Sequence, residues 1–132
     1  MVGHAGVDNH LDEIVASTNG NELYFNSGHC SWDNTNHKCE GAMVKVLTAS
    51  GIVAWQKKIV ASDRTNYQAI YATDVEIQDD LLYFAFMYLG DCLIIVLDTA
   101  GNEVMKKQFG VNEERDILGE LVFTSSSLYL FG

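Results

Sequence analysis

The chain repeats itself, and a fixed repeat period limits the possible folds more than any local pattern does. Residues 44–51 (Val-Lys-Val-Leu-Thr-Ala-Ser-Gly) align with residues 94–101 (Ile-Ile-Val-Leu-Asp-Thr-Ala-Gly) at an offset of 50. The same offset continues downstream through three more pairs, Trp55 with Met105, Lys57 with Lys107, and Ile59 with Phe109. The sequence therefore predicts a tandem arrangement of similar units.

Two further patterns extend the repeat over most of the chain. A Leu-Tyr strand occurs three times, at residues 23–25, 82–84 and 128–130. A Gly-Val pair is followed by an aspartate six residues after the glycine, at Gly6 and Asp12 and again at Gly110 and Asp116. Each unit is interpreted as four strands: one after the aspartate, one with Leu-Tyr, one of the Val-Lys-Val-Leu type and one of the Val-x-Trp type.

Turn-forming residues separate the expected strands, at residues 19–21, 49–51, 79–80, 100–102 and 125–127. The most apolar window, residues 81–97, is interrupted by Gly90 and Asp91 and is predicted to form two buried strands around a turn. It falls short of the ~20 residues that a membrane-spanning helix needs. Residues 113–121 could alternatively form a helical turn.

Four-stranded antiparallel units of ~50 residues are typical of β-propeller blades. We therefore expect an all-β fold, a β-propeller segment of about two and a half four-stranded antiparallel blades. The expected domain covers residues 1–132, with units at about 6–59 and 60–109 and a partial unit at 110–132.

The best copy resembles the bacterial SBBP-type β-propeller repeat, and the residues that carry the resemblance are Ile94, Asp98, Gly101, Met105, Phe109, Gly110, Asp116, Leu128, Tyr129 and Gly132. Through Gly51 and Trp55 the chain also resembles the broader quinoprotein-type repeat. The two units differ at two positions of the pattern: the first unit has Thr48 where the second has Asp98, and the second has Met105 where the first has Trp55. The middle copy lacks a Phe-Gly pair, so the strand boundaries over residues 60–71 stay open. The resemblance implies a fold and no reaction.

The charge balance disfavours two classes of partner. Eight basic residues against 18 acidic ones give a net charge of -10. Without a basic run, nucleic acid and anionic membranes are poor partners, and insertion into a membrane is not expected. The first ten residues lack the features of a signal peptide.

Cys30 and Cys39 bracket a polar loop between two strand-like runs, so a hairpin would bring them face to face. We predict a disulfide between them, worth about 2–3 kcal/mol in the chain-entropy model. A disulfide favours an oxidising compartment, which points to an extracellular or cell-surface location. Cys92 begins an apolar strand, where a buried, inert thiol is expected.

Three groups of residues are candidates for metal sites or carboxylate sites. His29, Cys30, His37 and Cys39 are weak zinc candidates, because their spacing matches no common zinc module. Residues 98–103 carry several side-chain oxygens near a glycine, although a plain hairpin turn explains them better. Asp12 and Asp116 recur, and are interpreted as backbone acceptors at blade corners rather than as paired catalytic carboxylates.

The chain lacks a nucleophile elbow and a phosphate-binding loop, so no catalytic residue and no cofactor is predicted. Trp32, Asp33 and His37 lie on the polar loop and are predicted to contact a ligand or partner, although Trp32 could instead pack over the hairpin. The expected function is a non-catalytic scaffold or binding module.

The alternative is a fragment of a quinoprotein-like or hydrolytic propeller enzyme with a site in its central channel. The expected partner is a second copy of the chain or further propeller blades. Apolar faces at the two ends are expected to receive it, formed by Leu121, Phe123, Leu128 and Leu130 at one end and by Ile14, Val15, Leu23 and Phe25 at the other.

Overall fold

The structure, a computed structural model, describes residues 8–32, 37–62, 70–88, 91–110, 120–123 and 128–131. These residues form the strands β1 (Asp8–Ala16), β2 (Glu22–Trp32), β3 (His37–Leu47), β4 (Val53–Ser62), β5 (Ile70–Gln78), β6 (Leu81–Tyr88), β7 (Asp91–Asp98), β8 (Glu103–Phe109), β9 (Glu120–Phe123) and β10 (Leu128–Phe131). None of the described segments is a helix long and apolar enough to cross a membrane.

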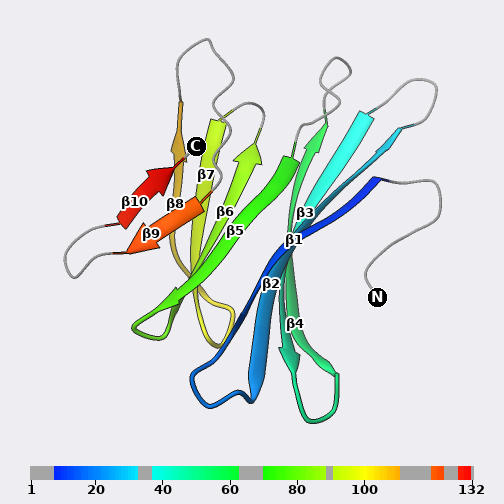
Figure 1. The fold of residues 1–132 in the computed structure, drawn as a ribbon. Coiled ribbons are helices and arrows are strands. Elements are labelled where there is room, and N and C mark those ends of the chain that lie inside the picture. Colours follow the sequence, from blue (N-terminus) through cyan, green and yellow to red (C-terminus); the bar gives the residue numbers. More distant parts are fainter. Residues whose placement is uncertain are drawn as a thin grey trace.

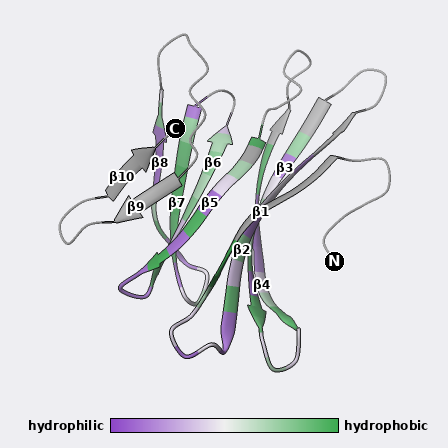
Figure 2. Ribbon diagram, viewed as in Figure 1, coloured by the Kyte–Doolittle hydropathy of each residue, from purple (hydrophilic) through white to green (hydrophobic). Residues whose placement is uncertain are grey.

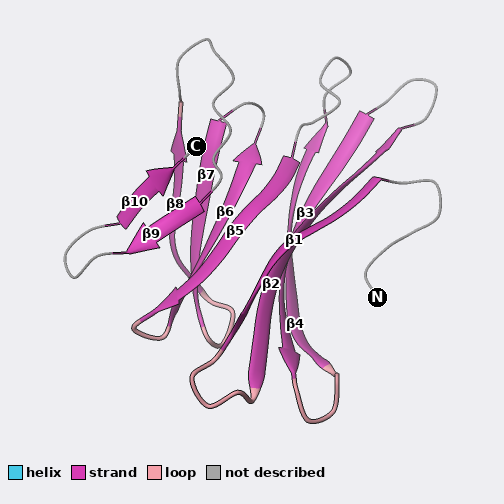
Figure 3. Ribbon diagram, viewed as in Figure 1, coloured by secondary structure: helices cyan, strands magenta, loops and turns pink. Residues whose placement is uncertain are grey.

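The strands form two four-stranded antiparallel sheets and one shorter pair (Figures 1 and 3). Sheet A has the order β1-β2-β3-β4, sheet B has the order β5-β6-β7-β8, and β9 pairs with β10. The all-β prediction is confirmed. The apolar window at residues 81–97 also forms two strands, β6 and β7, as predicted.

Sheets A and B share their irregularities as well as their strand order. The register shifts between Leu11 and Glu13 in β1, between Ala72 and Asp74 in β5, between Lys45 and Val46 in β3, and between Val96 and Leu97 in β7. Each shift therefore falls on the same strand of both sheets. The repeat seen in the sequence is a repeat of backbone geometry.

The structure corrects the alignment of β3 with β7 by one residue. Across the equivalent register shifts, Val46 pairs with Val53, whereas Leu97 pairs with Glu103. Leu97 therefore takes the place of Val46, although the offset of 50 aligns it with Leu47. The cause is an additional residue in the first turn, where the Gly51 amide donates to the Leu47 carbonyl while the Gly101 amide donates to that of Asp98.

Four of the five predicted turns lie in the described part of the chain, and each connects two neighbouring strands. Gly51 and Gly101 adopt positive φ angles of 72° and 90°, which suit glycine. Asp79 and Asp80 form a two-residue connection with φ of 52° and 61°, as a type I′ hairpin requires. The fifth predicted turn, residues 125–127, lies outside the described residues.

The main core lies between the two sheets, where β5 packs against β1 and β2. Tyr24 and Met43 enter it from sheet A, and Leu82, Phe84 and Phe86 enter it from sheet B. A second buried cluster lies on the other face of sheet B and includes Ala85, Cys92, Ile94 and Val96. Figure 2 shows the corresponding hydrophobic colouring of β6 and β7.

Buried and half-buried polar side chains fix the two sheets to each other. Asn26 Nδ2 donates to the carbonyl oxygens of Asp74 and Ala85 at 2.9 and 3.0 Å. At one end of the sheets, Lys45 Nζ and Trp55 Nε1 both donate to the carbonyl oxygen of Thr99. The β7–β8 turn of sheet B is thereby held against sheet A.

The two sheets approach closely at Gly41 of β3. A Cβ atom there would lie 2.8 Å from Ile59 Cγ1 and 3.0 Å from both Ile70 Cγ2 and Phe86 Cε1. Gly41 pairs with Gly28 on β2, so two neighbouring strands lack side chains at this point. Glycine within a strand often marks such a close approach.

The β9–β10 pair repeats the start of a unit. Leu128 pairs with Phe123, as Leu23 pairs with Ala16 and Leu82 with Ile77. β5 contacts both β1 and β9. The suggested helical turn at 113–121 does not extend to Glu120 and Leu121, which lie in β9, and its other residues fall outside the described part.

Candidate functional site

The predicted ligand loop lies at the tip of the β2–β3 hairpin. Trp32 and His37 form the last backbone pair of that hairpin, and Asp33 lies outside the described residues. In sheet B two residues separate Tyr88 from Asp91, whereas ten separate the equivalent pair, His29 and Glu40. The hairpin tip is therefore an insertion into the repeat of sheet A.

The two loop cysteines lie within this insertion. Cys30 pairs with Cys39 in the backbone register of β2 and β3, and Cys39 is fully buried. Cys92 is buried too, with its Sγ 3.9 Å from Met87 Sδ. The predicted position of Cys92 in an apolar strand is confirmed.

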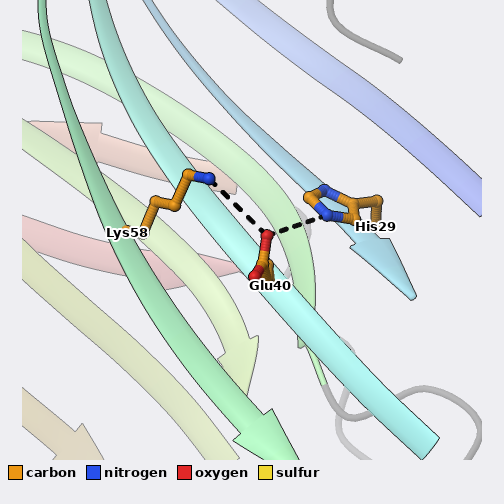
Figure 4. Close-up of polar contacts among 3 residues, drawn as sticks. All are labelled: His29, Glu40 and Lys58. Carbon is orange, nitrogen blue, oxygen red and sulfur yellow. Dashed lines mark ion pairs between the residues drawn. The ribbon is translucent and has the colours of Figure 1, made fainter. Parts of the chain in front are cut away.

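A histidine, a glutamate and a lysine meet where the insertion joins sheet A (Figure 4). His29 Nε2 lies 3.0 Å from Glu40 Oε2, and Lys58 Nζ lies 3.8 Å from the same oxygen. The Lys58 side chain is 53% exposed, so this ion pair is expected to contribute less than about 1 kcal/mol. Of the four suggested zinc ligands, His29 is thus already engaged by a carboxylate.

Sheet B has a matching polar contact at the equivalent positions. Gln108 Nε2 donates to Asp91 Oδ2 at 2.8 Å, as Lys58 approaches Glu40 in sheet A. Tyr88, which occupies the position of His29, donates its hydroxyl to the Val60 carbonyl of sheet A at 3.4 Å. In sheet B this corner therefore contacts the neighbouring sheet.

Residues 98–103, which were weighed as a calcium loop, form a turn whose polar groups bond to one another. Asp98 Oδ1 accepts hydrogen bonds from the amides of Ala100 and Asn102, and Asp98 Oδ2 accepts one from Asn102 Nδ2. The hydrogen bond from the Asn102 backbone, followed by that from its side chain, lowers the pKa of the Asp98 carboxyl. These bonds belong to a hairpin turn.

The carboxylates thought to recur at blade corners are described only in part. Asp12 lies at the register shift of β1, between Leu11 and Glu13, and Asp116 lies outside the described residues. Within the part of the chain that the structure describes, no three or more His, Cys, Asp or Glu side chains form a group able to hold a metal ion.

A polar cavity of about 620 Å³ opens at the turn end of the two sheets, lined by Ser17, Thr18, Asn19, Glu22, Tyr24, Lys45, Ile77, Asp79, Asp80 and Thr99. Burial, reinforced by the negative charges of Glu22 and Asp80, raises the pKa of the Tyr24 hydroxyl. Lys45 Nζ lies 5.7 Å from the Tyr24 ring centre and donates to Thr99. Its hydrogen bond thus serves to join the sheets.

A further candidate surface is the face of sheet A that points away from sheet B. We call it the open face, and define it by Ile14, Leu23, Phe25, Val46 and Val60, together with His29, Glu40 and Lys58. Ile14 is 52% exposed and Val60 47%, while Leu23, Phe25 and Val46 are half-buried. The exposed part lies toward the two outer strands, since Ser27, Ala42 and Val44 on the same face are at most 5% exposed.

The open face has a buried counterpart in sheet B. The residues equivalent to Ile14, Leu23, Phe25 and Val46 are Val75, Leu82, Phe84 and Leu97. All four are at most 2% exposed and belong to the core against sheet A. Val15, which the sequence placed on the same apolar surface as Ile14, instead packs into that core.

The polar residues that organise these faces, Asn26, Glu40, Lys45 and Lys58, were not predicted from the sequence. Asn26 had a weak signal in the sequence, because it directly follows the Leu-Tyr-Phe run where the second unit has the apolar Ala85. Glu40 and Lys58 change to Asp91 and Gln108 in the second unit, so a search for identical residues does not find them. Comparison of the chain with protein-family models, with curated proteins and with solved structures finds no match.

Proposed function

We propose that this chain is a β-propeller segment that acts as a non-catalytic scaffold or assembly module. The observation that carries the proposal is the open face, since its equivalent in sheet B is buried against a neighbouring sheet. The contact of β5 with both β1 and β9 supports the same order of units. In a propeller, each blade buries its faces on its neighbours.

The test is the size of the purified chain in dilute solution. Self-association is expected, because an apolar sheet face of this kind favours burial against another protein. Sedimentation velocity at several concentrations measures it. A monodisperse monomer with a single cooperative unfolding transition would contradict the proposal.

The hairpin tip is proposed as a contact for a ligand or partner, because it extends beyond the repeated part of sheet A. If it serves binding, replacing Trp32, Asp33 and His37 by alanine should leave the free energy of unfolding nearly unchanged. Urea unfolding of the triple variant measures this. Loss of the folded state would show that the loop is structural.

A Cys30–Cys39 disulfide and an extracellular or cell-surface location are proposed together. Support comes from the backbone pairing of the two cysteines in neighbouring strands. Intact-mass measurement after alkylation under denaturing, non-reducing conditions should show one labelled cysteine, Cys92. Labelling of all three cysteines would remove the argument for an oxidising compartment.

A further inference from the structure

We infer that the open face of sheet A binds the β9–β10 hairpin of a second copy of this chain, in a head-to-tail arrangement. The inference rests on the proposed propeller-segment function. It adds the identity of the partner and the two surfaces that meet.

The packing inside the chain supplies the template for this interface. Sheet A packs its Tyr24 face on sheet B, and the contacts run mainly from β1 and β2 to β5. The first hairpin of a unit therefore contributes most of the packing against the next unit. The β9–β10 pair has the register of such a first hairpin.

The register also identifies which side of β9–β10 corresponds to the packing face of sheet A. Val122 and Tyr129 occupy the positions of Val15 and Tyr24. Tyrosine stands at this position in all three units, as Tyr24, Tyr83 and Tyr129. Tyr24 is only 1% exposed because it lies in the core between the sheets.

The same register changes the face expected for the C-terminal leucines, which the sequence placed on an exposed apolar face. Leu121, Leu128 and Leu130 occupy the positions of Val75, Leu82 and Phe84, which face the preceding sheet. By register, the residues of β9–β10 that correspond to the packing face of sheet A are therefore Val122 and Tyr129.

The acceptor surface on sheet A is matched in the same way. β1 stands where β5 stands in sheet B, and Ile14 of β1 is equivalent to Val75 of β5. Ile14 is 52% exposed and Val75 is 1% exposed. A second copy that places its hairpin on β1 would give Ile14 the environment that Val75 already has. Such an interface joins different surfaces of identical chains, so it produces a ring or an open filament.

The deciding experiment mixes two variants, Ile14→Lys and Tyr129→Lys, each altered on one of the two surfaces. Each variant alone should associate at least about tenfold more weakly than the wild type, since a lysine is buried in the interface. The 1:1 mixture should form a dimer, because each chain retains the surface that the other lacks. Sedimentation velocity measures the masses, and circular dichroism checks that both variants are folded.

Two further variants serve as controls. Val104→Lys on β8 adds the same charge at a residue that is 55% exposed, and should associate like the wild type. Ile14→Ala removes apolar surface without adding charge, so a weaker effect in the same direction is expected.

Three outcomes overturn the inference. If the Ile14→Lys variant associates as strongly as the wild type, or if the mixture of folded variants stays monomeric, the head-to-tail interface is wrong. The proposed propeller segment would not be affected by either result. A monomeric, cooperatively unfolding wild type would overturn the proposed function, and this inference with it.

Discussion

Sheets A and B have the same strand order and the same register shifts, yet their burial differs. Sheet B contributes to two buried clusters, one on each face, whereas sheet A contributes to the cluster between the sheets. Phe84 is completely buried, while its equivalent in sheet A, Phe25, is half-buried. The comparison teaches that the neighbours of a sheet, rather than its own strands, determine how much of it is buried.

The two sheets also differ at the connection between their second and third strands. The polar contact at this corner is kept, as Glu40 with Lys58 in sheet A and Asp91 with Gln108 in sheet B. The insertion of sheet A begins beyond this contact, at Cys30. An insertion is tolerated here because it lengthens a hairpin without changing the register of the sheet.

The largest difference between the sheets is expected at the equivalent phenylalanines. Phe84→Ala should lower the free energy of unfolding by about 3–5 kcal/mol, since it leaves a cavity in the core. Phe25→Ala should lower it by about 1–2 kcal/mol, because a half-buried side chain removes less area from water. Urea unfolding at one protein concentration measures both. Equal losses would show that the open face is covered as completely as its counterpart.

A second test concerns the close approach of the sheets at Gly41. Gly41→Ala should destabilise the fold by about 1–3 kcal/mol, because the new methyl group would clash with Ile59, Ile70 and Phe86. Gly110→Ala is the matched control, since a Cβ there meets no atom within 4 Å. Its change should stay within about 0.5 kcal/mol. Thermal unfolding of both variants decides whether the sheets pack as closely as the structure shows.

A smaller effect is expected when the polar corner of sheet A is converted to that of sheet B. Lys58→Gln should change the free energy of unfolding by less than about 1 kcal/mol, since the lysine is half exposed. The stability of the wild type should fall slightly as salt screens the ion pair, while that of the variant should not. Unfolding at low and high ionic strength measures this. An equal salt dependence would mean that the Glu40–Lys58 pair contributes nothing.

The smallest effect concerns the turn of sheet B, where Asp98 replaces Leu47 of sheet A. Hydrogen bonds lower the pKa of Asp98 below its usual 3.8, so the folded state binds the proton less readily than the unfolded state. This contribution to stability is present above pH 3.8 and lost as the pH falls through the folded pKa. Asp98→Asn should therefore be less stable than the wild type near neutral pH and equally stable in acid. A difference independent of pH would contradict this role.

Much of the fold could be predicted because the repeat, the turns and the apolar strands are local patterns. The turns at Gly51 and Gly101 and the two strands of the apolar window were found in this way. The alignment of β3 with β7 was wrong by one residue. The turn after β3 has one residue more than the turn after β7, so Gly51 still aligns with Gly101 while β3 is shifted by one residue relative to β7. Such a shift is visible only in the pairing of the strands.

The candidate site could be predicted less well. That Cys30 and Cys39 lie opposite each other on β2 and β3 follows from local hairpin geometry, and the backbone register shows it. The disulfide between them stays a prediction. The open face depends instead on which sheet covers which, and no local pattern contains that information. Val15 and Ile14 are neighbours of similar character, yet one packs into the core and the other is exposed.

By itself, the sequence determined that the chain forms repeated antiparallel strands with turns at glycine and aspartate positions, because alternation and turn chemistry act over a few residues. Only the tertiary structure decided that Asn26, Lys45 and Trp55 join the two sheets, and that Ile14 and Val60 on the outer face of sheet A are exposed. These contacts connect residues 44 to 59 positions apart in the chain. They arise when two sheets meet, and at that distance no periodicity in the sequence specifies them.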